Sequence, residues 1–387
     1  MDEIGQTEAA GNDLAKRRVP CLIAYLNPFR MVEAETLAPW NATIADINGQ
    51  SWDYSALHEM AGGLEVGLNS PYHLVVTRDG ALALPPIDQL RSDQSAVAFF
   101  NRCLAALLIG GVYCEAVTPD GLDLGSIIDW KYVRSHRYGL AASNRFHEQI
   151  RYGKASAIEA ITLFRPRTIA FATLQNAMKS GLEVLNLLPT LQGEYLLKGG
   201  TGLARRDWGA ALANLWIVTE QLVSGLWARE VVEPTLKDNP STARRNQLND
   251  TRTWTVSARL ELLYQKGVIP AETFGALGKA RKARNSLSHE GKHPSERDAY
   301  ASYEGVRGLL SIALDGMRPA LFDVDLADHS LSDPFAPPKR LEMQPEFWME
   351  IPKLPGELEL ERAEAKSRIL KRRSRHEEKP SPGSSPG

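Results

Sequence analysis

The chain of 387 residues has few cysteines and almost no net charge. Each of these two absences excludes some classes of protein. Its three cysteines cannot all pair within one chain. Their spacing makes no metal site, so we expect reduced thiols and a cytoplasmic location. The formal net charge is −2 at pH 7, so overall charge indicates no partner.

The sequence also lacks a long apolar run and the common cofactor fingerprints. Its longest apolar run, Cys103–Val112, is far shorter than the ~20 residues that span a membrane. The N-terminal sequence MDEIGQTEAAGNDL is acidic and polar, unlike a secretory signal. The glycine-rich segment 192–202 matches neither a Walker A loop nor a dinucleotide fingerprint. We therefore expect no membrane association and no cofactor.

Apolar patterning predicts an α+β N-terminal half. A hairpin is expected over His73–Leu84, because two apolar runs flank the favoured turn pair Asp79-Gly80. Other apolar runs predict strands at Val19–Leu26 and Val112–Val117, and helices at Gln94–Ile109 and Thr168–Leu188. After Trp130 the pattern turns helical and basic, with His136, Arg137, Arg145, His147 and Arg151. We interpret these five as a solvated helix face rather than a nucleic-acid groove.

The second half is patterned as a helical bundle. Amphipathic stripes predict helices at Arg205–Val232, Val256–Lys266 and Arg297–Met317, together with one from Pro270 to the breakers Gly291 and Pro294. Pro234 is expected to end the first helix.

These patterns divide the chain into parts. They are a flexible arm (1–18), an α+β domain with a helical end and a candidate sensor role (19–190), a linker (191–203), a four-helix bundle (204–319), a proline-rich arm (320–356) and a charged, disordered tail (357–387). The tail also contains a charged stretch, Glu357–Lys379, whose composition is compatible with one exposed helix.

The segment Lys279–Pro294 combines a basic surface with an arginine and a histidine five residues apart. Arg284 falls in line with apolar positions of its helix, followed by Asn285 and then His289. Five residues correspond to about 140° around an ideal helix, so the two side chains converge only if the last turn loosens. Around them lie the basic residues Lys279, Arg281, Lys282, Lys292 and Arg297, which we predict to bind RNA.

Arg-Asn-x-x-x-His, late in the third helix of a helical domain, resembles the R-x(4–6)-H motif of the HEPN superfamily. The resemblance covers about residues 204–319 and implies a HEPN-like bundle, which makes the protein mostly α overall. Members of the abortive-infection and Apea-like kind include metal-independent endoribonucleases. The resemblance therefore implies an antiphage or toxin effector, with two motifs facing each other across a homodimer cleft.

The chemistry of such a site needs little beyond two side chains. RNA is cut without a metal ion when its 2′-hydroxyl attacks the adjacent phosphorus. His289 would move the proton as general acid/base, and Arg284 would stabilise the phosphate charge. Asn285 would orient the phosphate or the imidazole, and Glu220 would support Arg284 by pairing with it.

Other readings of the same residues stay open. Arg284 and Glu220 can form a purely structural ion pair, and His289 can simply favour a helix C-terminus. The bundle can also be a non-catalytic HEPN module that binds RNA, a nucleotide or a partner protein. A further reading is the helical half of a HEPN/nucleotidyltransferase toxin–antitoxin pair, with an antitoxin or regulatory protein as partner. Gly291 weakens it, because such toxins commonly carry tyrosine there. We interpret His293 as loop surface and discount Ser286 and Ser288 as nucleophiles.

Deletion of Glu357–Gly387 should leave folding intact, because little of this charged segment can be buried. If the tail adds RNA affinity, the deletion should weaken binding more at low salt than at high salt. Thermal unfolding and RNA titration at two salt concentrations check both expectations. A large drop in melting temperature would contradict them.

Overall fold

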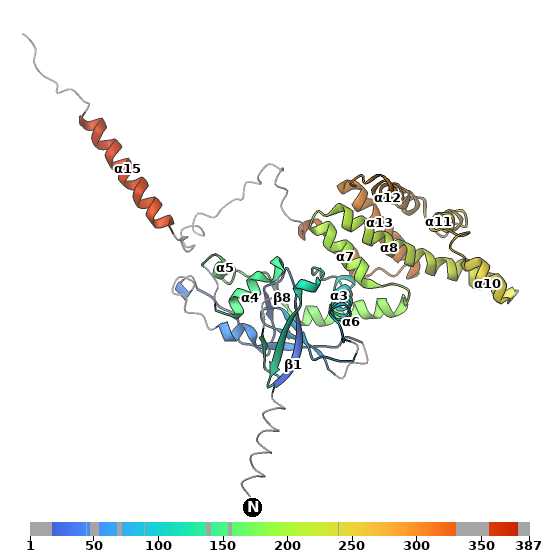
Figure 1. Ribbon diagram of the computed structural model, residues 1–387, viewed down its shortest axis with the longest axis horizontal. Helices are drawn as coiled ribbons and strands as arrows, with labels where there is room; N and C mark the ends of the chain where they lie inside the picture. The colour runs from blue at the N-terminus through green and yellow to red at the C-terminus, as the bar shows by residue number, and fades with distance from the viewer. Residues whose placement is uncertain are drawn as a thin grey trace, which may run out of the picture.

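The structure is a computed structural model that describes residues 18–43, 45–46, 54–67, 72–88, 90–136, 141–153, 157–238, 240–329 and 356–377. The chain forms an N-terminal antiparallel sheet followed by helices (Figure 1). The α+β and mostly α expectations are confirmed at that level. Residues 1–17 of the predicted arm (1–18), most of the proline-rich arm and the last ten residues lie outside the described residues, and Arg18 begins the first strand.

Six strands make the main sheet, in the order β3-β4-β5-β1-β6-β7. They are β1 (Arg18–Tyr25), β3 (Met60–Leu64), β4 (Leu74–Thr77), β5 (Ala81–Leu84), β6 (Asp123–Ile128) and β7 (Tyr132–Ser135). The predicted strand at Val19–Leu26 and the predicted hairpin are confirmed. Gly80 takes the left-handed conformation that the hairpin turn requires, with φ +78°.

The sheet curves until its two edges meet. Glu59 and Tyr132 form an antiparallel bridge, and the amide of Met60 donates to the carbonyl of Lys131 at 2.6 Å. The inner face of this half-barrel holds a small apolar core, made of Cys21, Ile23, Tyr25, Val75, Ala81, Ala83, Ile127 and Val133. Helix α4 (Arg145–Arg151) packs against the inner face.

Helices α3 (Asp93–Ile109) and α6 (Phe171–Leu187) belong to the large core that contains the outer side of β4 and β5. Both helices were predicted. A side strand, β8 (Thr168–Ala170), precedes α6 and pairs in parallel with β2 (Met31–Glu33). Short elements complete this half: η1 (Tyr54–His58), η2 (Pro119–Gly121), η3 (Ala142–Asn144) and α5 (Ala157–Ile161).

The second half is helical throughout its described part, residues 205–238 and 240–318, where no strand occurs. Its helices are α8 (Trp208–Trp227), α9 (Glu233–Asp238), α10 (Thr242–Asn249), α11 (Val256–Gln265), α12 (Ala271–Glu290) and α13 (Glu296–Ala313). The short turns η5 (Ala320–Asp323) and η6 (Ala327–His329) follow, and α15 spans Glu357–Glu377. The charged stretch expected in a disordered tail is thus helical over most of its length.

The expected linker at 191–203 is wrong. This segment forms α7 (Gly193–Ala204), most of which is buried. Its glycines are needed for close packing: a side chain at Gly202 would meet the backbone of Ala211, and one at Gly199 would meet Leu215. Because α7 joins both halves, one buried core runs from the sheet through α3, α6 and α7 to α8 and α13. The two halves are not packed separately.

Two local predictions are also wrong. Residues 112–117 form no strand, because side chains satisfy the backbone there: the amides of Ala116 and Val117 donate to Thr201 and Asn101. Pro234 does not end the helix. A π-helical turn at Ala228–Val232 follows α8, and Pro234 then falls in the first turn of α9, where its missing N–H is not needed.

Gly181→Ala should destabilise the protein by about 1–3 kcal/mol, the usual range for overpacking a core. The reason is that its new methyl group would overlap the backbone of Ala106, so α3 and α6 must move apart. Thermal or urea unfolding measures the change. Gly275→Ala is the matched control, because nothing lies within 4 Å of its new methyl group. The control should stabilise the protein, since alanine is the better helix former.

Candidate functional site

The end of α12 carries the three predicted catalytic residues on a regular helix. The helix continues through Glu290, and Gly291 closes it in the left-handed conformation with φ +64°. The amide of Lys292 then donates to the carbonyl of Ser286 at 3.2 Å. His289 and Asn285 are exposed, while Arg284 is half-buried.

Arg284 and His289 do not come together within one chain. The expectation that the last turn loosens is wrong, because the cap at Gly291 keeps that turn helical. The two side chains therefore leave the helix about 140° apart. The Arg284 guanidinium instead donates to the Asn285 side chain at 3.4 Å.

Glu220 does not support Arg284 as predicted. Its carboxylate accepts from the indole of Trp216 at 2.7 Å, one turn earlier on α8. Within the described part of the chain, no ion pair joins Glu220 to Arg284. The geometry thus offers no carboxylate that neutralises this arginine.

A basic hollow of about 240 Å³ lies between the end of α12 and the start of α13. Three of the five residues predicted to bind RNA line it, together with Ser286, Asp298 and Pro294; they are Lys279, Lys282 and Lys292. Arg281 does not line it, because its guanidinium bonds to Ser257 on α11. Arg297 is exposed on α13 but also lies outside the lining.

His293 lines the basic hollow, although its sequence context suggested plain loop surface. The signal that could have found it is its position between the cap at Gly291 and Ser295, the N-cap of the next helix. Asp298 places one carboxylate at this hollow, where it accepts from the Ser295 amide and hydroxyl at 2.9 and 2.7 Å. Those hydrogen bonds hold the pKa of Asp298 below its usual value.

A second depression continues from the hollow along α12 and α13. It is a groove of about 660 Å³ that shares Lys279 with the basic hollow. Small residues form much of its floor, including Gly275, Ala276, Gly308 and Ser311. Neither Arg284 nor His289 lines the hollow or the groove, but the exposed His289 follows Ser286, which lines the hollow, by three residues on α12.

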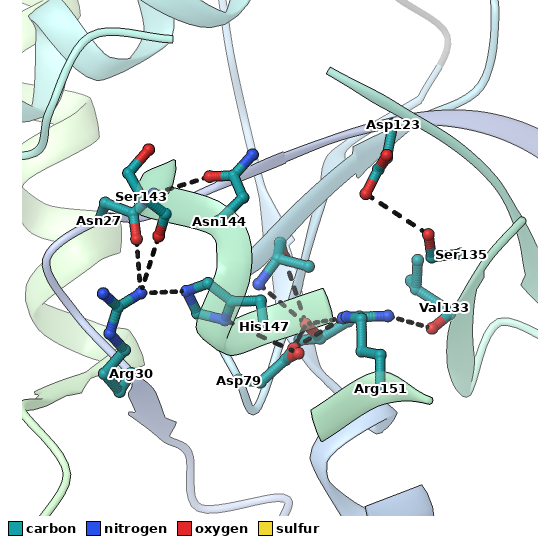
Figure 2. Close-up of polar contacts among 12 residues, drawn as sticks. Asn27, Arg30, Asp79, Asp123, Val133, Ser135, Ser143, Asn144, His147 and Arg151 are labelled. Atoms are coloured by element: carbon teal, nitrogen blue, oxygen red, sulfur yellow. Dashed lines mark hydrogen bonds and ion pairs between the residues drawn. The ribbon is translucent and has the colours of Figure 1, made fainter. Parts of the chain in front are cut away.

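The N-terminal half contains a buried polar network that the sequence did not reveal (Figure 2). Asp79 and Arg151 form an ion pair at 2.7 Å, and each side chain is 1% exposed. Arg151 also donates to the carbonyl of Val133 at 2.7 Å and to Thr77 at 3.2 Å. The interpretation of this stretch as a solvated face is wrong for His147 and Arg151, which point into the half-barrel.

His147 links this ion pair to a second cluster of polar side chains. Its Nε2 accepts from Arg30 at 2.8 Å, and its Nδ1 lies 4.0 Å from Asp79. Arg30 also donates to Asn27, whose amide donates to Asn144 at 2.9 Å (Figure 2). Burial and the neighbouring Arg30 lower the pKa of His147 to about 3, so this imidazole is neutral at physiological pH.

Among the described residues, one small hollow reaches the network. The hollow beside Tyr25, Asn27 and Asn144 holds about 10 Å³, no more than one water molecule needs. Burial raises the pKa of Asp79, but its neighbours, Arg151 foremost, together outweigh burial and keep the pKa below its ordinary value. The network therefore anchors α4 inside the sheet.

The described residues hold no group of three or more His, Cys, Asp or Glu side chains placed to bind a metal ion. All three cysteines are buried and free. None of the described helices is both long and apolar enough to cross a membrane. Comparisons with protein-family models, curated proteins and solved structures found no match.

Glu148→Gln should change how stability depends on pH. Burial, with a smaller contribution from Asp123, raises the pKa of Glu148 to about 7. A raised pKa in the folded protein favours the neutral carboxyl, so its contribution is complete below about pH 4.5 and is lost as the pH rises through 7. The glutamine variant should match wild type at pH 5 and be more stable at pH 8.

Melting temperatures across this pH range measure the effect. Glu183→Gln, at an exposed position of α6, is the control and should follow wild type. Parallel curves for wild type and Glu148→Gln would contradict the expectation.

Proposed function

We propose that the protein is a metal-independent endoribonuclease of the HEPN type, whose site forms between the α12 ends of two copies. The observation that carries the proposal is the exposed His289, three residues along α12 from Ser286, which lines a hollow together with three lysines and His293. Lysines recognise phosphate as point charges, and a concave basic surface concentrates a polyanion.

Dimerisation can bring together the two side chains that one chain keeps apart, Arg284 and His289. Arg284 and His289 lie about 140° apart on a regular helix, so one copy offers either side chain to a given phosphate but not both. In a two-fold dimer the same patch faces itself, and Arg284 of one copy can meet His289 of the other. The positively charged Arg284, with no carboxylate partner in the described residues, suits a phosphate that arrives from outside.

The reaction removes one proton from the 2′-hydroxyl and adds one proton to the 5′-oxygen. His289 accepts the proton of the 2′-hydroxyl, and the 2′-oxygen forms a bond to phosphorus as the bond to the 5′-oxygen breaks. The departing 5′-oxygen takes up a proton, and Arg284 stabilises the charge on the phosphorane oxygens. The products are a 2′,3′-cyclic phosphate and a 5′-hydroxyl. DNA cannot react because it lacks the attacking hydroxyl.

A binding module without catalysis is the second candidate. It is favoured by the separation of Arg284 and His289 in one chain. In that case the lysine-lined hollow would hold RNA, a nucleotide or a partner protein without cutting. Incubation of the full chain with tRNA and total RNA in EDTA, followed by end-group analysis, separates the two. Cyclic phosphate ends support the nuclease, and intact RNA that remains bound supports the module.

His289→Ala and Arg284→Ala should each lower the cleavage rate about 10²–10⁴-fold, the usual cost of losing an acid/base group or a charge stabiliser. Co-expression with two different tags allows the mixed dimer of the two variants to be purified. A composite site predicts that this mixed dimer regains about half of the wild-type activity, because one of its two sites is intact.

His293→Ala is the comparison, since it removes a histidine from the basic hollow but not from the reaction. It should raise KM and leave kcat near wild type. A mixed dimer as inactive as its parents would rule out the shared site. Cleavage by His289→Ala at the wild-type rate would rule out the nuclease mechanism.

A further inference from the structure

The outward face of strands β1, β6 and β7 is exposed on one side of the half-barrel. Register places three rows of side chains on it, Arg18–Ile128–Tyr132, Pro20–Ser126–Arg134 and Leu22–Leu124–His136. The alternate residues of the same strands point into the buried inner core. On the outward side Leu124 is 47% exposed and Tyr132 is 38% exposed. We call these rows, with the turn 129–131 and Tyr72, the open face.

The hairpin turn between β6 and β7 presents a tryptophan in a conformation that favours glycine. Asp129 and Trp130 have φ of +51° and +53°, and Lys131 N–H donates to Ile128 at 2.9 Å. This is a type I′ turn, for which Asp-Gly is among the preferred pairs. A bulky residue in the left-handed region costs free energy that the turn does not require. The geometry of the hairpin therefore gives no reason for a tryptophan at this position.

Trp130 extends an aromatic surface instead of filling a core. Its ring is 42% exposed and stacks on Tyr72, with centroids 6.0 Å apart and planes inclined by 22°. Tyr72 is 38% exposed. Tyr132 follows two residues later on the edge of β7 and adds a third exposed ring.

The cations of the open face are not neutralised by acids. Arg18 bonds to His136 at 3.1 Å and to Ser126 at 3.2 Å, so its guanidinium is held over the sheet by a histidine and a serine. Arg134 and Lys131 are exposed. Among the described residues, none of these three cations takes part in an ion pair. The turn residue Asp129 is the acid within the face.

We infer that the open face binds single-stranded RNA. Exposed rings beside unpaired cations suit this ligand, because bases stack on aromatic side chains while basic residues hold the backbone. Tyr132 and the Trp130–Tyr72 pair would stack bases, and Arg18, Lys131 and Arg134 would contact phosphates. Protein interfaces are also enriched in Tyr, Trp and Arg, so a protein contact is the alternative against which the oligouridine titration tests this inference. The choice of RNA rests on the proposed nuclease function, whereas the stacking and charge arguments do not.

Binding is measured with the His289→Ala chain, so that the test does not depend on cleavage. A fluorescent oligouridine of about ten nucleotides is titrated, and anisotropy reports its affinity. Tyr132→Ala should weaken binding roughly five- to 150-fold, the value of one stacked base. Tyr132→Phe keeps the ring and should bind as the parent does. Tyr264→Ala is the control, because Tyr264 is also 38% exposed but lies on α11.

Trp130→Gly separates a binding role from a structural one. It creates the favoured Asp-Gly turn, so the melting temperature should stay the same or rise. The affinity for oligouridine should nevertheless fall at least fivefold, because a stacking surface is lost. Affinity equal to that of the Tyr264→Ala control, for either Trp130→Gly or Tyr132→Ala, would overturn the inference.

Charge and strandedness complete the test. Arg134→Ala should weaken binding mainly at low salt and lower the slope of log affinity against log salt by about 0.7. Arg102→Ala, at an exposed position of α3, should leave this slope unchanged.

A duplex of the same length should bind at least tenfold more weakly, since its bases are already stacked on each other. A duplex that binds equally well would overturn the inference. Loss of cleavage with normal binding here would refute only the nuclease proposal.

Discussion

The buried ion pair between Asp79 and Arg151 determines how the N-terminal half holds its shape. Asp79 lies in the tight turn between β4 and β5, and Arg151 lies at the end of α4 and donates to β7. One guanidinium thus ties together parts of the sheet that are far apart in sequence. Removing one partner of such a buried pair typically costs 3–5 kcal/mol, because the other charge is then left unpaired. The curvature of the sheet, and with it the outward face of β6 and β7, depends on this contact.

Some of this architecture follows from sequence because local rules decide it. The Asp79-Gly80 pair and its flanking apolar runs predict the hairpin, and the stripes of α3, α11, α12 and α13 predict those helices. These local rules do not predict helix α7. Its glycines lower helix propensity, yet they allow α8 to approach closely, so tertiary packing overrides a local preference. The conformation of the extended segment near Val117 is not predicted by local rules for a similar reason. The side chains of Asn101 and Thr201 accept the hydrogen bonds that a neighbouring strand would otherwise accept.

The candidate site was predictable in its residue types but not in its geometry. The basic surface around Lys279, Lys282 and Lys292 follows directly from sequence, because consecutive charged residues of a helix end are seldom buried. The separation of Arg284 and His289 depends on how Gly291 caps the helix, which spacing alone does not fix. The buried roles of His147 and Arg151 were missed because their partners, Asp79 and Arg30, are distant in sequence. His147 and Arg151, which belong to a basic stretch predicted to be solvated, are therefore part of a buried polar network.

The continuous core through α7 has a consequence for the modularity of the chain. A sensing half and an effector half connected by a flexible linker could be exchanged or expressed separately. Here α7 lies in one core with both halves, so a fragment that begins at residue 204 would leave α8 without the helix against which Ala211 and Leu215 pack. Both halves should unfold as one cooperative unit. A substitution that destabilises the sheet should therefore also destabilise α8 and α13, without any hinge motion between the halves.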